Sequence, residues 1–163
     1  MNIRYLTKAS LIAAIYLVLI LLQALPFPVA NLTFGPVQFR IAEGLTLLPM
    51  VESAAVPGLF IGVLLANFIL APYSGFGLVD IIGGSLVTLL AAYITSKAKN
   101  RYAAMVPPIL LNGIIVSIWV SYFTKIPYVY TVLGITAGEL VSVVLFGSII
   151  LYVYEKASKY REW

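Results

Sequence analysis

The hydrophobic residues of this chain fall in long runs, which short stretches rich in proline, glycine or charge interrupt. The runs are too long for the strands of a membrane barrel and lack their alternation of apolar and polar positions, so they predict helices. The interruptions divide the chain into six predicted helices, at residues 9–25, 37–50, 55–70, 78–96, 107–123 and 131–154. Because about 20 apolar residues cross a bilayer as a helix, the pattern predicts an all-α membrane protein in which residues 1–163 form one integral domain.

Composition supports this class and excludes others. Hydrophobic residues make up 62% of the chain and charged residues only 10%, against about 25% charged residues in a typical soluble domain. The basic residues lie near the ends and in one short loop and form no stripe, so we expect no nucleic-acid binding. The chain has no Cys and no His, which removes thiol chemistry, zinc sites and the usual general base. We therefore expect no enzyme, no metal and no cofactor.

The distribution of Lys and Arg predicts the orientation. With six spans and a cytoplasmic N-terminus, 8 of the 10 basic residues lie on the cytoplasmic side, and the exceptions are Arg40 and Lys125. By the positive-inside rule, both termini are then cytoplasmic, and the outer loops are 26–36, 71–77 and 124–130. A signal peptide is the alternative for the first run. That run is long for one and no cleavage site follows it, so we expect a retained helix.

Six ionisable or amide residues interrupt five of the predicted helices. They are Arg40, Glu43, Asn67, Asp80, Asn112 and Glu139. An ionisable group at membrane depth costs several kcal/mol and normally faces a bundle interior or a cavity. The predicted orientation places all six at outer or middle depth. The sequence therefore predicts an outward-facing, partly acidic pocket.

Each of these residues also has a structural alternative. Arg40 and Glu43 are three residues apart and can form a structural ion pair. Asp80 can cap the start of its helix, and Asn67 can cap the end of its own. Glu139 has no partner within one turn, which favours a functional role. The other acidic residues are expected on the solvated surface: Glu52, Glu155 and Glu162.

The predicted pocket favours a cationic or donor-rich ligand. A carboxylate accepts two parallel hydrogen bonds from a ring N–H and an exocyclic amino group, so a guanine-type edge fits an acidic site, and an Asn can serve the carbonyl. Aromatic residues near the outer loops are candidates for stacking on a planar ring, although most are expected in an interfacial belt. The stacking candidates are Phe34, Tyr73, Phe76, Trp119 and Tyr128.

The first helix carries small residues at helical spacing. Ala9 and Ala13 form a small-xxx-small pair near its cytoplasmic end, and Ser10 and Ala14 repeat the spacing. Small residues let another helix approach closely. The pair therefore predicts either a docking surface for a partner protein or ordinary packing within the chain.

Six short helices with A-x-x-x-A in the first resemble the substrate-binding S components of energy-coupling-factor (ECF) transporters. Within that group, the segment FGPVQFRIAEGLTLLP at residues 34–49 resembles the signature of the queuosine-precursor transporter (QueT) family. Segments 62–67 and 80–88 are similar to that family too. One departure is Gly44, where the family pattern has Ala, and we expect it to loosen the helix locally.

This resemblance implies a six-helix S-component bundle in a bacterial or archaeal plasma membrane. It also implies a partner complex of one coupling transmembrane protein and two cytoplasmic ATPases, and a deazaguanine substrate such as 7-aminomethyl-7-deazaguanine or queuine. Glu43 or Glu139 would then hold the guanine edge, another carboxylate would meet the ammonium group, and loop 26–36 would close as a lid. Two alternatives stay open: an S component for another vitamin-like ligand, and a stand-alone secondary carrier for a small cation.

Overall fold

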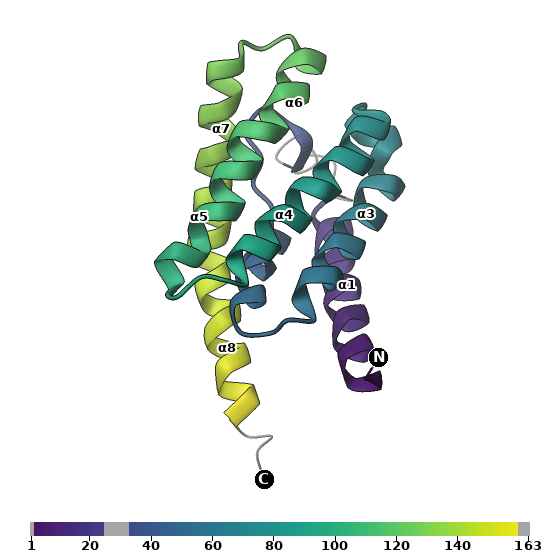
Figure 1. Ribbon diagram of the computed structural model, residues 1–163. Coiled ribbons are helices and arrows are strands. Elements are labelled where there is room, and N and C mark those ends of the chain that lie inside the picture. The colour runs from purple at the N-terminus through teal and green to yellow at the C-terminus, as the bar shows by residue number, and fades with distance from the viewer. Residues whose placement is uncertain (1, 25–32, 160–163) are drawn as a thin grey trace.

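The structure is a computed structural model that describes residues 2–24 and 33–159, and within these residues every regular element is a helix. Four helical segments are long and apolar enough to cross a membrane. They are α1 (Ile3–Ala24), α3 (Ala55–Ser74), the continuous α5 (Arg101–Leu111), η3 (Asn112–Val116) and α6 (Ser117–Thr124), and the continuous α7 (Tyr128–Val141), η4 (Ser142–Gly147) and α8 (Ser148–Lys159). Two apolar segments are shorter: the 3₁₀ helix η1 (Ile41–Met50), and η2 (Val79–Gly84) continued by α4 (Ser85–Thr95). The helical fold is confirmed, and α1 begins at the end of the bundle where α8 finishes (Figure 1).

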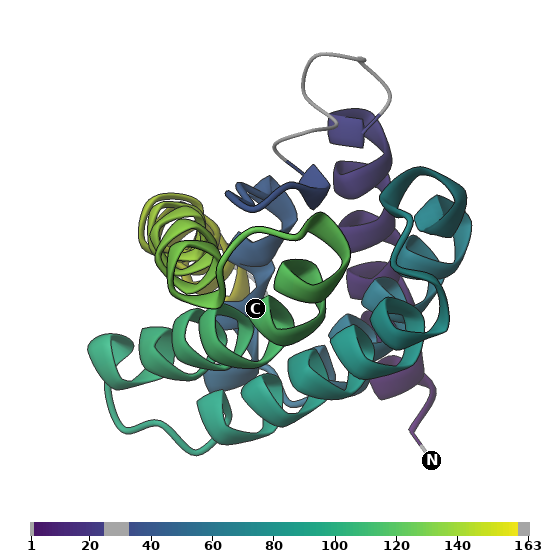
Figure 2. The ribbon, with the colours of Figure 1, turned by 90° about the horizontal axis from the view of Figure 1, so that it is seen from above.

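The predicted helix at 37–50 is wrong in its first part and in its type. Residues 37–40 are not helical, and Arg40 has extended backbone angles (φ −128°, ψ 114°). The ten residues of η1 rise about 2 Å each and so cover roughly 20 Å, less than the hydrocarbon core of about 30 Å. The non-helical segment 35–40, which we call the strap, precedes η1 along the chain. Seen from above, η1 lies in blue among the long helices (Figure 2).

Two predicted helix bounds next to prolines are wrong: the end of the helix predicted at 55–70 and the start of the helix predicted at 107–123. α3 continues through Pro72, and α5 contains both Pro107 and Pro108. The side chain of Asn100 accepts a hydrogen bond from the backbone N–H of Ala103 at 2.8 Å and caps the start of α5. The N-cap therefore sets where α5 begins.

A glycine on α7 lets the strap lie close against that helix. A Cβ on Gly138 would contact the carbonyl oxygen of Gln38 and would lie 2.6 Å from its carbonyl carbon and 3.3 Å from Phe39 N. Any larger residue would push the strap away from α7. The contact thus fixes the path of the strap into the bundle.

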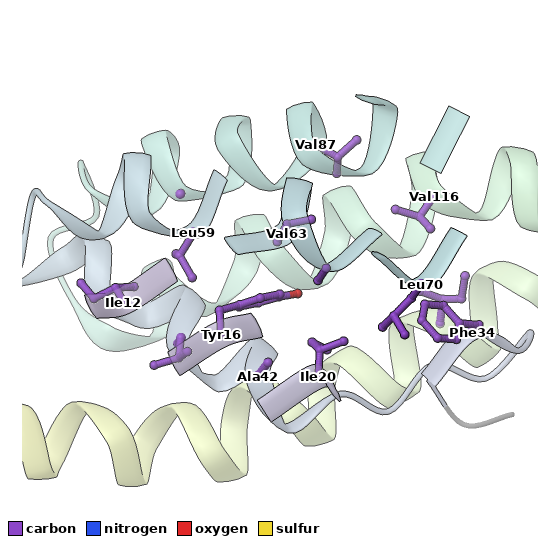
Figure 3. Close-up of a cluster of buried hydrophobic side chains, with 14 of the residues drawn as sticks. Ile12, Tyr16, Ile20, Phe34, Ala42, Leu59, Val63, Leu70, Val87 and Val116 are labelled. Carbon is purple, nitrogen blue, oxygen red and sulfur yellow. The ribbon is translucent and has the colours of Figure 1, made fainter. Parts of the chain in front are cut away.

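The apolar core lies beside the strap, between α1, η1, α3, α4 and α6. Figure 3 shows Tyr16 of α1 in this core, with Leu59 and Val63 of α3 nearby. Tyr16 is 1% exposed, so its ring is packed among apolar groups while its hydroxyl needs a polar partner. That partner belongs to the site described next.

Candidate functional site

Charged residues from separate elements converge on Arg40 at the end of the strap. Its guanidinium interacts electrostatically with Glu43 of η1, Asp80 of η2 and Glu139 of α7. All four residues are buried, with exposed fractions of 8% for Arg40 and 2–4% for the acids. The group thus has two more carboxylates than guanidinium groups. A buried excess of acids favours a ligand that brings positive charge or several hydrogen-bond donors.

Glu43 is held by Tyr16 and lies beside Arg40. The Tyr16 hydroxyl donates to Glu43 Oε1 at 2.5 Å, and Arg40 Nη1 lies 3.9 Å from the same oxygen. The predicted ion pair is therefore present, at a length beyond an ordinary hydrogen bond. The next residue is Gly44, which packs closely against η4. A Cβ there would lie 2.7 Å from Phe146 Cβ, so this position needs glycine for close packing.

The partner of Glu139 comes from another helix. Asn112 Nδ2 donates to Glu139 Oε1 at 3.1 Å, which joins α7 to the first residue of η3. Both side chains are buried. The structure thus brings together two of the predicted site residues that are 27 positions apart along the chain.

Asp80 accepts a hydrogen bond from Trp119 Nε1 at 3.1 Å, and its backbone carbonyl accepts one from Asn67 Nδ2 at 2.8 Å. The side chain of Asp80 caps no helix, and Asn67 lies inside α3 and not at its end. The capping alternatives for both residues are therefore wrong. Instead, these contacts connect α3, η2 and α6.

Three π-helical segments carry residues of this group. Asp80 lies in η2, Asn112 begins η3, and Ser142 begins η4. The hydroxyl of Ser142 accepts a hydrogen bond from the backbone N–H of Arg40 at 3.1 Å. Single-turn π segments occur frequently at functional sites because they redirect side chains within a helix. Here they interrupt three helices next to the same cluster.

The sequence pattern missed two amides. Gln23 of α1 holds the strap, because its Nε2 donates to the carbonyl of Phe39 and to Thr33 Oγ1, while its Oε1 accepts from Ile41 N at 3.0 Å. Gln38, two residues before Arg40, is only 2% exposed. Two features of the sequence could have pointed to them: Gln23 lies near the end of an apolar helix, and Gln38 lies close to Arg40 along the chain.

Five buried polar atoms have no hydrogen-bond partner among the described residues. They are Gln38 Nε2, Arg40 Nη2, Glu43 Oε2, Asp80 Oδ2 and Glu139 Oε2. Leaving a buried polar atom unsatisfied costs about 1–3 kcal/mol. The unsatisfied atoms come from the strap, η1, η2 and α7 and include both donors and acceptors. The arrangement therefore suits a ligand that has both.

The predicted stacking residues do not all reach this group. Trp119 belongs to it through Asp80, and the Phe34 ring centroid lies 5.5 Å from Arg40 Cζ. Phe34 also lines a cavity of about 320 Å³ with Tyr73, Phe76 and Phe123. In contrast, Tyr128 is 41% exposed and donates to the carbonyl of Ile114, away from the carboxylates. Most of the predicted lid, 26–36, lies outside the described residues.

The small residues of α1 serve the packing of the chain and also line a groove. Ala9 and Ala13 are buried against α3, where their backbone atoms lie next to Gly58 and Gly62. Both alanines also line a groove of about 180 Å³ with Ser10 and Ile61. The two alanines therefore serve packing within the chain, and the groove beside them keeps a docking surface for a partner protein as the second alternative.

The expectation that Glu52 is solvated is wrong. Glu52 is 9% exposed, forms an ion pair with Lys8 and accepts hydrogen bonds from Tyr154 at 2.6 Å and from Ala54 N at 3.1 Å. Burial raises the pKa of this carboxyl, but the donors outweigh burial and lower it below its ordinary value. Glu155 pairs with Arg101 at 2.5 Å and stays partly exposed, and Glu162 lies outside the described residues.

The comparison with known families agrees with the sequence motif. The family model described as QueT transporter matches residues 6–156. No curated protein and no solved structure matches the chain. Together, this match and the four long apolar helices of the structure point to a multi-pass membrane protein and to a transporter rather than an enzyme. The chain belongs to the QueT transporter family.

Proposed function

We propose that this chain is the substrate-binding S component of an ECF-type importer and that it captures a queuosine precursor. The ligand would be a 7-deazaguanine base such as 7-aminomethyl-7-deazaguanine or queuine. Partner subunits would hydrolyse ATP and the complex would release the base inward. The observation that carries the proposal is the set of unpaired buried polar atoms around Arg40 in a chain of this family.

The ligand's chemistry complements that set. The N1–H and the exocyclic amino group of a guanine-type ring are two parallel donors, which suit the two oxygens of the Glu43 or Glu139 carboxylate, and in each of these the Oε2 has no hydrogen-bond partner among the described residues. An aminomethyl ammonium is a cation that suits a second carboxylate. The excess of buried acids over Arg40 is then reduced by the charge of the ligand.

Docking on the coupling protein would use the groove beside Ala9 and Ala13. Ser10 lines this groove and is exposed, whereas Ile15 is 41% exposed on another face of the same helix and does not line it. A Ser10→Trp variant would fill the groove with a large ring and should reduce co-purification with the coupling protein and the ATPases. Ile15→Trp is the matched control and should co-purify as the wild type does. Equal recovery with both variants would contradict docking at this groove.

Uptake of isotope-labelled 7-aminomethyl-7-deazaguanine by cells that contain the whole importer tests the proposed function. The Glu43→Gln variant should lose uptake while its amount in the membrane stays at the wild-type level, because the amide removes the charge and one acceptor. Wild-type uptake in this variant would remove Glu43 from the site. Uptake without the ATPases, dependent on a proton or sodium gradient, would favour the secondary carrier.

A further inference from the structure

The strap carries two buried hydrogen-bond donors, one on Arg40 in the acidic cluster and one on Gln38, two positions before it. Gln38 and Arg40 are two positions apart in the part of the strap where Arg40 has extended backbone angles, and side chains at this spacing on extended backbone point to the same side. Gln38 Nε2 and Arg40 Nη2 are both buried without a hydrogen-bond partner among the described residues. The intervening Phe39 packs instead against Phe146, with its ring centroid 5.7 Å away. The donors therefore form a pair on one side of the strap.

The backbone that carries this pair is held at several points. The Gln38 carbonyl lies against Gly138 of α7, and the backbone N–H of Arg40 donates to Ser142 Oγ at 3.1 Å. The Arg40 side chain is also anchored, because its Nε donates to the Thr33 carbonyl at 2.9 Å. A donor pair on a fixed backbone can select a ligand by the position of its acceptor atom.

A ligand without an acceptor would leave these donors unpaired. A metal ion or a simple ammonium ion can meet the carboxylates, but it offers nothing to Gln38 Nε2 or Arg40 Nη2. A ring carbonyl oxygen has two lone pairs and can accept from both donors. In a guanine-type ring this carbonyl is adjacent to the N1–H. The protein has the complementary order: Glu43 Oε1, an acceptor for the N1–H, lies 3.9 Å from Nη1 of Arg40, a residue of the donor pair.

We propose that Gln38 and Arg40 together donate to the ring carbonyl oxygen of the ligand, and that Gln38 thereby makes the site select oxo over amino heterocycles. This inference rests on the proposed function and deepens it. Gln38 is the residue through which the selection can be tested, because Arg40 is also needed to balance the carboxylates.

The test is calorimetric titration of the purified protein with two ligands. One is 7-aminomethyl-7-deazaguanine, and the other is its analogue in which an amino group replaces the ring oxo group. Wild type should prefer the oxo ligand. Gln38→Leu should lose roughly tenfold in affinity for the oxo ligand and much less for the amino analogue, since only the former loses a hydrogen bond. Gln38→Glu should shift the preference further toward the amino analogue.

Asn100→Asp serves as the control, because it makes the same amide-to-acid change in a helix cap outside the cluster. It should leave both affinities unchanged. An equal loss for both ligands in Gln38→Leu, or no loss, would overturn the role of Gln38. A wild-type preference for the amino analogue would overturn it too, because the amide would then present its oxygen. Failure of wild type to bind either ligand would instead overturn the proposed substrate.

Discussion

Gly138→Ala is expected to displace the strap and weaken ligand binding. The new Cβ would lie 2.6 Å from the Gln38 carbonyl carbon, whereas carbon atoms in contact are about 3.5–4.0 Å apart. The strap would therefore have to move by about 1 Å. Overpacking of this kind costs about 1–3 kcal/mol, while Ala for Gly inside a helix regains up to about 1 kcal/mol. A displacement of this size also takes Gln38 and Arg40 out of line with the ligand.

The matched control is Gly83→Ala, where a Cβ would make only ordinary contacts of 3.7 and 3.8 Å with the Trp119 ring. Denaturant unfolding in detergent should place Gly138→Ala about 1–3 kcal/mol below Gly83→Ala in free energy of unfolding. Titration with 7-aminomethyl-7-deazaguanine should show a loss of affinity of roughly ten- to hundredfold for Gly138→Ala, corresponding to about 1.4–2.8 kcal/mol. The control should bind as wild type does. Equal stability and equal affinity of the two variants would refute the idea that Gly138 positions the strap.

Two further predictions concern single hydrogen-bonding groups. Tyr16→Phe removes the donor to Glu43 Oε1 and should lower ligand affinity by roughly tenfold; unchanged affinity in the same titration would show that the hydroxyl does not hold the carboxylate. Glu52→Gln should lower the free energy of unfolding at pH 7 by about 1 kcal/mol or less, because its partner Lys8 is 44% exposed. The pKa of Glu52 is lower in the folded state, so the stabilisation is present above the unfolded pKa of about 4.3 and is lost as the pH falls through the folded value. Unfolding curves of wild type and variant should therefore converge in acid, and a gap that stays constant with pH would contradict this account.

The sequence predicted the helices well where long apolar runs exist, because hydrophobicity over many residues is a strong signal. It failed for residues 37–40, which continue an apolar pattern but follow Pro36 and lie without helical structure against α7. That path depends on Gly138, about 100 positions away, and no local pattern indicates such a contact. The π segments were missed for a related reason, since their hydrogen bonding depends on packing around them.

The candidate site was predicted through its charges. An Arg or carboxylate inside an apolar run is conspicuous, so Arg40, Glu43, Asp80 and Glu139 could be named, and the structure brings them together. The amides Asn67 and Asn112 could be named because they lie inside apolar runs, whereas Gln38 escaped notice because it lies at the very start of the helix predicted at 37–50, next to a predicted loop where a polar residue is ordinary. Tyr16 was missed for another reason: a Tyr in a membrane helix usually lies at the interface, and only the fold shows its hydroxyl on Glu43.

The central claim is that the cluster around Arg40 captures a flat deazaguanine base. Mass spectrometry of small molecules retained by the protein, purified from cells supplied with queuosine precursors, tests it most directly. The account predicts a 7-deazaguanine mass from wild type and its loss from the Glu139→Gln variant, which keeps the Asn112 contact region but loses a buried charge. A different compound class from wild type, or equal recovery of the base from both proteins, would contradict the account.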